Sequence, residues 1–109
     1  PDWKVLIKQF TISIDKMSED NQNDTVYLYR GISYNQLLSF EKAIADLTKA
    51  IKINRLSPSP YYHRAIAYYC LDSLERSLKD CNTVLDEFDN AGFNTAASLL
   101  KDKAIALMD

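Results

Sequence analysis

A stretch between Asp24 and Asp89 contains the same pattern of residues twice, at a fixed interval of 34 residues. A period in the range of about 20–50 residues is typical of solenoid proteins, whose units cannot bury their apolar faces alone. The chain is therefore expected to fold as stacked units of the same structure. The matching pairs are Tyr27 and Tyr61, Arg30 and Arg64, Gly31 and Ala65, Tyr34 and Tyr68, Phe40 and Leu74, Ala43 and Ser77, Ile44 and Leu78, Asp46 and Asp80, and Ile51 and Leu85.

The composition fits one globular domain made of helices. The chain has 109 residues, of which 47% are hydrophobic and 26% are charged, and it has only two glycines and three prolines. Few helix breakers favour long helices over many turns. The net charge of −2 argues against a nucleic-acid partner, which requires a basic face. No apolar run approaches the roughly 18 residues of a membrane span, so none is predicted.

Apolar residues at spacings of three and four predict an all-α fold of about six helices joined by short loops, so that neighbours are antiparallel. The β-branched Ile12 and Ile14 leave a strand possible in the first segment, but its wide apolar stripe favours a helix. Asp2, Ser39, and Asp72 or Ser73 are predicted helix caps, and Gly92 a left-handed stop. The expected helices are residues 2–19, 25–38, 40–53, 60–71, 74–88 and 94–108.

The two copies resemble a pair of tandem tetratricopeptide repeats, which are antiparallel helical hairpins stacked into an α-solenoid. Small residues facing each other, Gly31 with Ala43 and Ala65 with Ser77, are expected to let the two helices of each hairpin approach closely. The resemblance is carried in the first copy by Tyr27, Gly31, Tyr34, Phe40, Ala43, Leu47 and Ala50, and in the second by Tyr61, Ala65, Tyr68, Leu74, Ser77, Cys81 and Val84.

The resemblance implies a single domain over residues 1–109 with incomplete units at both ends. Residues 24–57 form the first repeat and residues 58–91 the second. Residues 2–23 are expected to hold a helix of a preceding or capping unit. Residues 92–109 are expected to form a partial repeat or a capping helix. Unpartnered terminal helices also suggest that the chain is a piece of a larger array.

The recurring Arg30 with Asp46, and Arg64 with Asp80, are expected to tie the first helix of each hairpin to the second. An alternative interpretation is that the two arginines form a row that binds anions. Partly exposed ion pairs contribute only ~0.5 kcal/mol, so the pairs would set geometry more than stability.

No residue pattern supports catalysis, a metal or a cofactor. His63 is the only histidine, with a partner contact or an ordinary surface position as its expected roles. Cys70 and Cys81 form no metal motif and are expected to be reduced and buried, although a disulfide across the intervening turn is conceivable. The chain is therefore predicted to be non-enzymatic and cytoplasmic, with a nuclear location possible.

Tetratricopeptide arrays hold a peptide in a concave groove lined by the first helix of each unit, and the resemblance implies the same surface here. One subclass grips the C-terminal carboxylate of heat-shock chaperones with a clamp of basic and amide residues. The corresponding places hold Leu28, Tyr29, Ile32, Ser59 and His63, which argues against that chaperone role. The predicted partner-binding residues are Leu28, Tyr29, Ile32, Asn35, Gln36, Tyr62, His63, Ile66 and Tyr69.

An aromatic and aliphatic groove with a few amides suits an apolar or amphipathic peptide. The first hypothesis is therefore a scaffold or adaptor module that binds a segment of a partner protein. The second is a structural or self-associating segment, whose groove is filled by its own chain or by a second copy. A third possibility is that the chain is a regulatory segment of an enzyme, for which the sequence gives no specific evidence.

Overall fold

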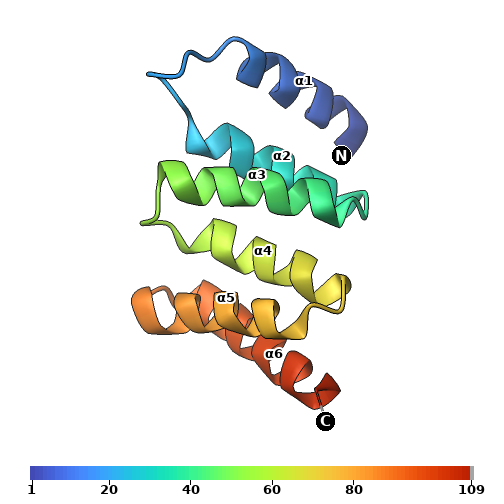
Figure 1. The fold of residues 1–109 in the computed structure, drawn as a ribbon, viewed down its shortest axis with the longest axis vertical. Helices are drawn as coiled ribbons and strands as arrows, with labels where there is room; N and C mark the ends of the chain where they lie inside the picture. The colour runs from blue at the N-terminus through green and yellow to red at the C-terminus, as the bar shows by residue number, and fades with distance from the viewer. Residues whose placement is uncertain (109) are drawn as a thin grey trace.

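The computed structural model describes residues 1–108, and Asp109 lies outside this range. Within it the chain forms helices and no β-strand, which confirms the predicted all-α fold. Figure 1 shows the helices stacked along the long axis of a molecule that measures 45 × 26 × 21 Å. The six helices are α1 (Trp3–Asp15), α2 (Asp24–Gln36), α3 (Phe40–Ile53), α4 (Pro58–Cys70), α5 (Leu74–Glu87) and α6 (Ala91–Leu107).

The helices form two layers. Each helix packs against the next one in the chain, and in addition α2 contacts α4 and α4 contacts α6. The helices α1, α3 and α5 make no such contacts with one another. The structure is therefore a solenoid of antiparallel hairpins, as predicted, with α2, α4 and α6 side by side on one surface.

Small residues allow the close approach within each hairpin. A Cβ atom added to Gly31 would lie 2.8 Å from Cγ and 2.9 Å from Cδ2 of Leu47, so α2 and α3 touch at this glycine. In the second hairpin Ser77 Oγ donates to the carbonyl oxygen of Ala65 at 2.8 Å. Ala43 and Ala65 are fully buried, so the packing role predicted for the small residues is confirmed.

Several predicted helix bounds were wrong. The first helix ends at Asp15 rather than at residue 19, and the fourth begins at Pro58 rather than at residue 60. The sixth begins at Ala91, so Gly92 lies inside its first turn and has no positive φ. The capping residue of α6 is Asn90, whose side chain accepts from the Phe93 backbone N–H at 3.1 Å.

Both hairpins turn through the same backbone motif, which the sequence analysis did not predict. Leu38 and Asp72 each have φ of 61° and lie 34 residues apart. After Leu38, the N–H of Ser39 donates to the carbonyl of Tyr34 at 2.9 Å, and Ser73 does the same with Tyr68. This pattern is a Schellman motif, which ends α2 and α4.

The caps were only partly predicted. Asp2 does cap α1, because its Oδ1 accepts from the N–H groups of Lys4 and Val5. Ser39 and Ser73 precede α3 and α5, but their side chains make no capping hydrogen bond. Their backbone N–H groups instead close the turn that ends the preceding helix.

Candidate functional site

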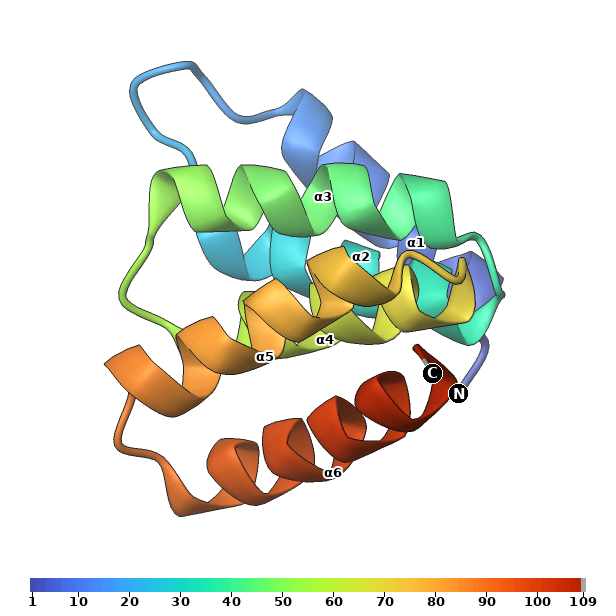
Figure 2. The ribbon, with the colours of Figure 1, turned by 60° about the horizontal axis from the view of Figure 1, so that its bottom comes forward.

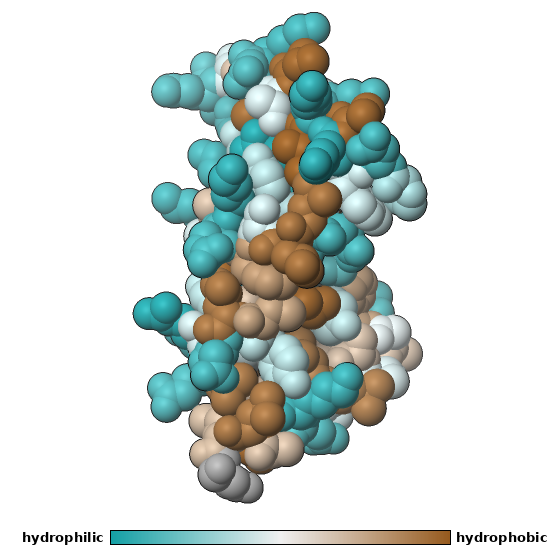
Figure 3. Space-filling model, turned by 90° about the vertical axis from the view of Figure 1, so that its right-hand side faces the viewer, coloured by the Kyte–Doolittle hydropathy of each residue, from teal (hydrophilic) through white to brown (hydrophobic). Residues whose placement is uncertain are grey.

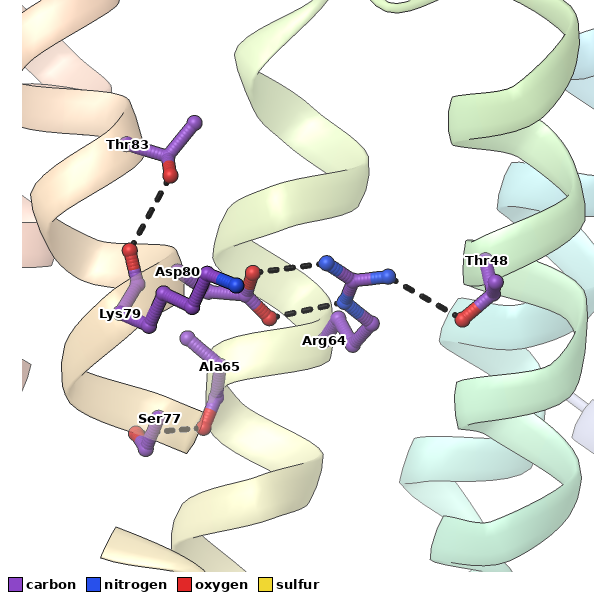
Figure 4. Close-up of polar contacts among 7 residues, drawn as sticks. All are labelled: Thr48, Arg64, Ala65, Ser77, Lys79, Asp80 and Thr83. Carbon is purple, nitrogen blue, oxygen red and sulfur yellow. Dashed lines mark hydrogen bonds and ion pairs between the residues drawn. The ribbon is translucent and has the colours of Figure 1, made fainter. Parts of the chain in front are cut away.

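Two arginines bridge neighbouring helices in the same way. Arg64 Nε and Nη2 each donate to the Asp80 carboxylate at 2.8 Å, and Arg30 binds Asp46 through the same two atoms at 2.7 Å. The predicted tie between the two helices of each hairpin is therefore confirmed. Figure 4 shows that Nη1 of Arg64 also reaches in the opposite direction, to Thr48 of α3.

The third contact of each arginine joins it to the helix that precedes its own in the chain. Arg64 Nη1 donates to Thr48 Oγ1 at 3.2 Å, and Arg30 Nη1 donates to Thr11 Oγ1 of α1 at 3.2 Å. The hydrogen bonds that Arg30 donates to the Asp46 carboxylate raise the pKa of Arg30 above its ordinary value. Burial opposes the charge of Arg64, but the hydrogen bond and the charge of Asp80 outweigh it and raise the pKa. Both guanidinium groups are thus engaged inside the fold, which leaves no row of free arginines for an anion.

The predicted groove residues lie on α2 and α4, two helices that contact each other on one surface. We call this set of nine residues the α2–α4 surface. Tyr29 and Gln36 are exposed and Asn35 is buried. The other six are half-buried: Leu28, Ile32, Tyr62, His63, Ile66 and Tyr69.

Asn35 departs from its predicted role as an open groove residue. Its side chain is 8% exposed, and its Nδ2 donates to the backbone carbonyl oxygen of His63 at 3.0 Å. The amide therefore links α2 to α4 beneath the surface. Its Oδ1 is buried and has no hydrogen-bond partner among the described residues.

Aromatic residues from α1 and α6 extend the α2–α4 surface at both ends. Phe10 stacks on Tyr29 with ring centroids 6.4 Å apart. Phe93 packs edge-on to Tyr62 at 5.8 Å, and Tyr62 also contacts His63 at 5.3 Å. Sequence reasoning missed Phe10 and Phe93, because neither belongs to the 34-residue repeat that located the other groove residues.

His63 is an uncharged member of this surface near neutral pH. Burial lowers its pKa from an ordinary value of 6.5 to about 4. Burial, and secondarily the nearby Cys81, raise the pKa of Tyr62. The surface therefore presents neutral aromatic, aliphatic and amide groups.

The two cysteines occupy different environments. Cys81 is buried, and burial together with the Asp80 charge raises its pKa to about 11. Cys70 is exposed, so the prediction that both cysteines are buried was wrong for this residue. Both thiols are free.

Another apolar feature lies on the side that carries the α2–α3 and α4–α5 turns. Figure 3 shows hydrophobic residues there in a band along the long axis of the molecule. Leu38 belongs to the first of these turns and its side chain is 73% exposed. A polar or glycine residue is usual at such a left-handed turn position.

Residues 1–108 contain no group of three or more His, Cys, Asp or Glu side chains arranged to hold a metal ion. No helix among them is both long enough and apolar enough to cross a bilayer. A shallow hollow of about 430 Å³ runs along α5, lined mainly by charged and amide side chains, and includes none of the nine groove residues.

Comparisons with known proteins agree with the observed architecture. No family model matches the chain. It is 29% identical over 82 residues to human Sperm-associated antigen 1, and the match covers 72% of this chain and 9% of the human protein. The fold is similar to that of the Hsp90 co-chaperone Cns1 from Saccharomyces cerevisiae, with a TM-score of 0.82 and 19% identity.

The structural match covers 98% of this chain and 35% of Cns1. The chain thus spans about a third of one of these proteins and about a tenth of the other. At this level of identity the structural match establishes the fold alone. Together with the repeated residues, the two similarities support a tetratricopeptide-like helical repeat.

Proposed function

We propose that the chain is a non-catalytic protein-interaction module that holds an apolar or amphipathic peptide of a partner protein on the α2–α4 surface. The supporting observation is that all nine residues of this surface are uncharged, although the surface is partly open to solvent. Tyr29 is exposed and its ring stacks on that of Phe10, and an exposed tyrosine is a side chain of the kind that dominates protein interfaces. An adaptor or scaffold role follows from this surface.

The neutral surface favours an apolar partner over an acidic one. Cns1 is an Hsp90 co-chaperone, and similar folds bind acidic carboxylate tails through cationic clamps. The places expected to hold the clamp carry Leu28, Tyr29, Ile32, Ser59 and His63 here, and His63 is neutral at pH 7. A buried carboxylate without a cationic partner loses more hydration than it gains in contacts. The proposed ligand therefore carries no terminal carboxylate in the groove.

The division of the chain into units is part of the same proposal. Thr11 on α1 accepts from Arg30 as Thr48 on α3 accepts from Arg64. This equivalence supports the interpretation of α1 as the second helix of a preceding or capping unit. The two free thiols suit a reducing compartment, so a cytoplasmic location also belongs to the proposal.

The test is a fluorescence-anisotropy titration with two labelled peptides, one apolar with an amidated C-terminus and one acidic with a free carboxylate. The apolar peptide is expected to bind more tightly. Tyr62→Ala and Tyr69→Ala should each weaken its binding by about tenfold, the loss typical of an interface anchor. Leu56→Ala is the matched control, because Leu56 is 86% exposed and lies outside α2 and α4.

Three outcomes would overturn the proposal. Preferential capture of the acidic peptide would favour a carboxylate-binding role. Equal binding of the apolar peptide by all variants would show that the binding site lies outside the α2–α4 surface. Sedimentation of the chain across a range of concentrations provides the third, since self-association abolished by Tyr62→Ala would show that a second copy occupies the surface.

A further inference from the structure

Asn35 connects the two helices that carry the α2–α4 surface. Its Nδ2 donates to the backbone carbonyl oxygen of His63 at 3.0 Å, and among residues 1–108 this is the only side-chain hydrogen bond between α2 and α4. In Figure 2 these two helices lie side by side behind α3 and α5. The helix α2 packs far more extensively against α3 than against α4. The amide is therefore a directional link in a sparsely packed junction.

This link lies beneath the residues of the surface. Leu28, Ile32 and Asn35 follow one another at spacings of four and three residues, which places them on one side of α2. Asn35 is buried, whereas Leu28 and Ile32 are half-buried. The carbonyl that accepts belongs to His63, a residue of the surface on α4. Any shift between the amide and this carbonyl would move the two halves of the surface relative to each other.

The 34-residue repeat does not require an amide at this position. The equivalent residue of the second copy is Tyr69, which packs against a buried apolar cluster of α4, α5 and α6. An aromatic ring thus satisfies the same position by apolar packing. The amide of Asn35 is specific to the junction between α2 and α4, where it supplies a hydrogen bond of fixed direction.

The amide also carries an energetic cost. Oδ1 of Asn35 is buried and has no hydrogen-bond partner among the described residues. A buried acceptor without a donor has given up its bonds to water, and an apolar side chain of similar size would avoid that loss. An unfavourable group at the point where the two halves of the surface meet is expected of a residue that serves geometry rather than stability.

We infer that Asn35 is a positioning residue, which sets the angle and spacing between α2 and α4 so that one peptide contacts both helices at once. The inference rests on the proposed function and narrows the ligand to a peptide with two apolar anchors. One anchor lies against Tyr29 and Ile32 of α2, and the other lies against Tyr62 and Ile66 of α4. Asn35 is buried and acts on the peptide only through the position of the two helices.

Peptides with one or two phenylalanine anchors test this geometry. The two-anchor peptides carry Gly/Ser spacers of increasing length and an amidated C-terminus, and fluorescence anisotropy measures their binding to the full chain. The affinity is expected to peak at one spacer length. At that length it should exceed the affinity of the one-anchor peptide by about tenfold or more, because the second anchor binds at a high effective concentration.

Asn35→Leu removes both the donor and the unpaired acceptor and keeps a side chain of similar size. We expect a flatter dependence on spacer length, with binding about fivefold weaker at the original optimum. The one-anchor peptide should bind the variant and the unaltered chain within about twofold, since each anchor site by itself is intact. A merely structural role for Asn35 would leave the optimal spacer length unchanged.

Asn54→Leu is the matched control for the loss of an amide. Asn54 Nδ2 donates to Asp24 Oδ2 at 3.3 Å and so joins the end of α3 to the start of α2. Asn54 lies outside the α2–α4 surface. The control variant is therefore expected to keep the same optimal spacer length as the unaltered chain.

Residual dipolar couplings of the ¹⁵N-labelled chain measure the same geometry without any peptide. In Asn35→Leu the orientation of α4 relative to α2 is expected to change. The orientation of α3 relative to α2 should stay the same, because the bridge between Arg30 and Asp46 is intact. Circular dichroism establishes first that the variant keeps its helix content, and Asn35→Ala takes its place if leucine does not fit.

The inference is overturned if α2 and α4 have the same relative orientation in the variant and in the unaltered chain. It is also overturned if the unaltered chain binds two-anchor peptides no more tightly than the one-anchor peptide, a result that leaves the proposed function standing. If no apolar peptide binds, the proposed function fails and the two-anchor ligand fails with it. A changed helix orientation would in that case still support Asn35 as the residue that positions α4 against α2.

Discussion

Arg64 and Asp80 are joined by two parallel hydrogen bonds of 2.8 Å, and the same guanidinium reaches Thr48 on the preceding hairpin. One side chain therefore connects α3, α4 and α5. Arg30 repeats the arrangement with Asp46 and Thr11. The Arg–Asp bridges thus use the same atoms at the interval of the sequence repeat, whereas the two threonines that accept from the arginines lie 37 residues apart.

Arg64→Ala is expected to lower the free energy of unfolding by about 2–4 kcal/mol. The change leaves the nearly buried Asp80 carboxylate without its two donors, which costs more than the pair itself contributes. Urea denaturation followed by circular dichroism measures the loss. Arg55→Ala, at an exposed position in the loop after α3, should change stability by less than about 0.5 kcal/mol. Equal effects of the two changes would show that the bridge does not stabilise the stack.

Gly31→Ala is expected to destabilise the fold by about 1–3 kcal/mol, although alanine normally favours a helix. The new Cβ would lie under 3.0 Å from two carbon atoms of Leu47, which is fully buried and cannot move away. At the equivalent positions the second hairpin has Ala65 and Cys81. The pair of a very small and a large residue in the first hairpin, Gly31 and Leu47, is thus replaced there by two residues of intermediate size.

The double variant Gly31→Ala with Leu47→Cys should therefore recover most of the loss. Leu47→Cys alone leaves a cavity and is expected to cost about 2–4 kcal/mol. A double-mutant cycle measured by urea denaturation should give a favourable coupling of about 2 kcal/mol. Simple additivity of the two losses would contradict the proposed size match between the helices.

The hairpins were predictable because the residues that pack inside them occur twice in the sequence, at an interval of 34 residues. Arg30 and Asp46 recur as Arg64 and Asp80, and the separation within each pair is the same, so the sequence alone pairs them. The contacts to Thr11 and Thr48 lie between units rather than within one, and threonine has no feature that distinguishes it from other polar surface residues. For that reason they emerged only from the coordinates.

The candidate surface was predictable only in outline. The helix positions of Tyr29 and Tyr62 follow from the repeat, but their neighbours Phe10 and Phe93 come from segments outside it. The burial of Asn35 depends on how closely α4 approaches α2, since its amide reaches the His63 carbonyl. The turn at Leu38 was missed because leucine is an unusual residue for a left-handed conformation.

Leu38→Gly is expected to raise the free energy of unfolding by up to about 1 kcal/mol. A left-handed conformation costs a leucine about 1–2 kcal/mol, and the greater freedom of glycine in the unfolded chain returns part of that gain. The leucine side chain is mostly in water, so little packing is lost. Leu38→Ala is the control for the removed side chain and should be close to neutral. Stabilisation by alanine as large as that by glycine would rule out relief of backbone strain.

The pKa of His63, lowered to about 4 by burial, makes stability depend on pH in a defined window. The unfolded chain binds a proton at this residue near pH 6.5, whereas the folded chain does not until about pH 4. The stabilising effect of the neutral side chain is therefore complete above pH 6.5 and is lost as the pH falls towards 4. The loss over this window is expected to be about 1–3 kcal/mol, measured by urea denaturation at a series of pH values.

His63→Gln is the matched variant for this measurement, since it keeps a polar side chain of similar size that does not titrate. Its free energy of unfolding should vary less between pH 6.5 and 4 than that of the unaltered chain, and the difference between the two curves isolates the histidine. Parallel curves would mean that His63 titrates at its ordinary pKa and carries a proton at mildly acidic pH. The α2–α4 surface would then become cationic below pH 6.5, and binding of the apolar peptide would weaken in the same range.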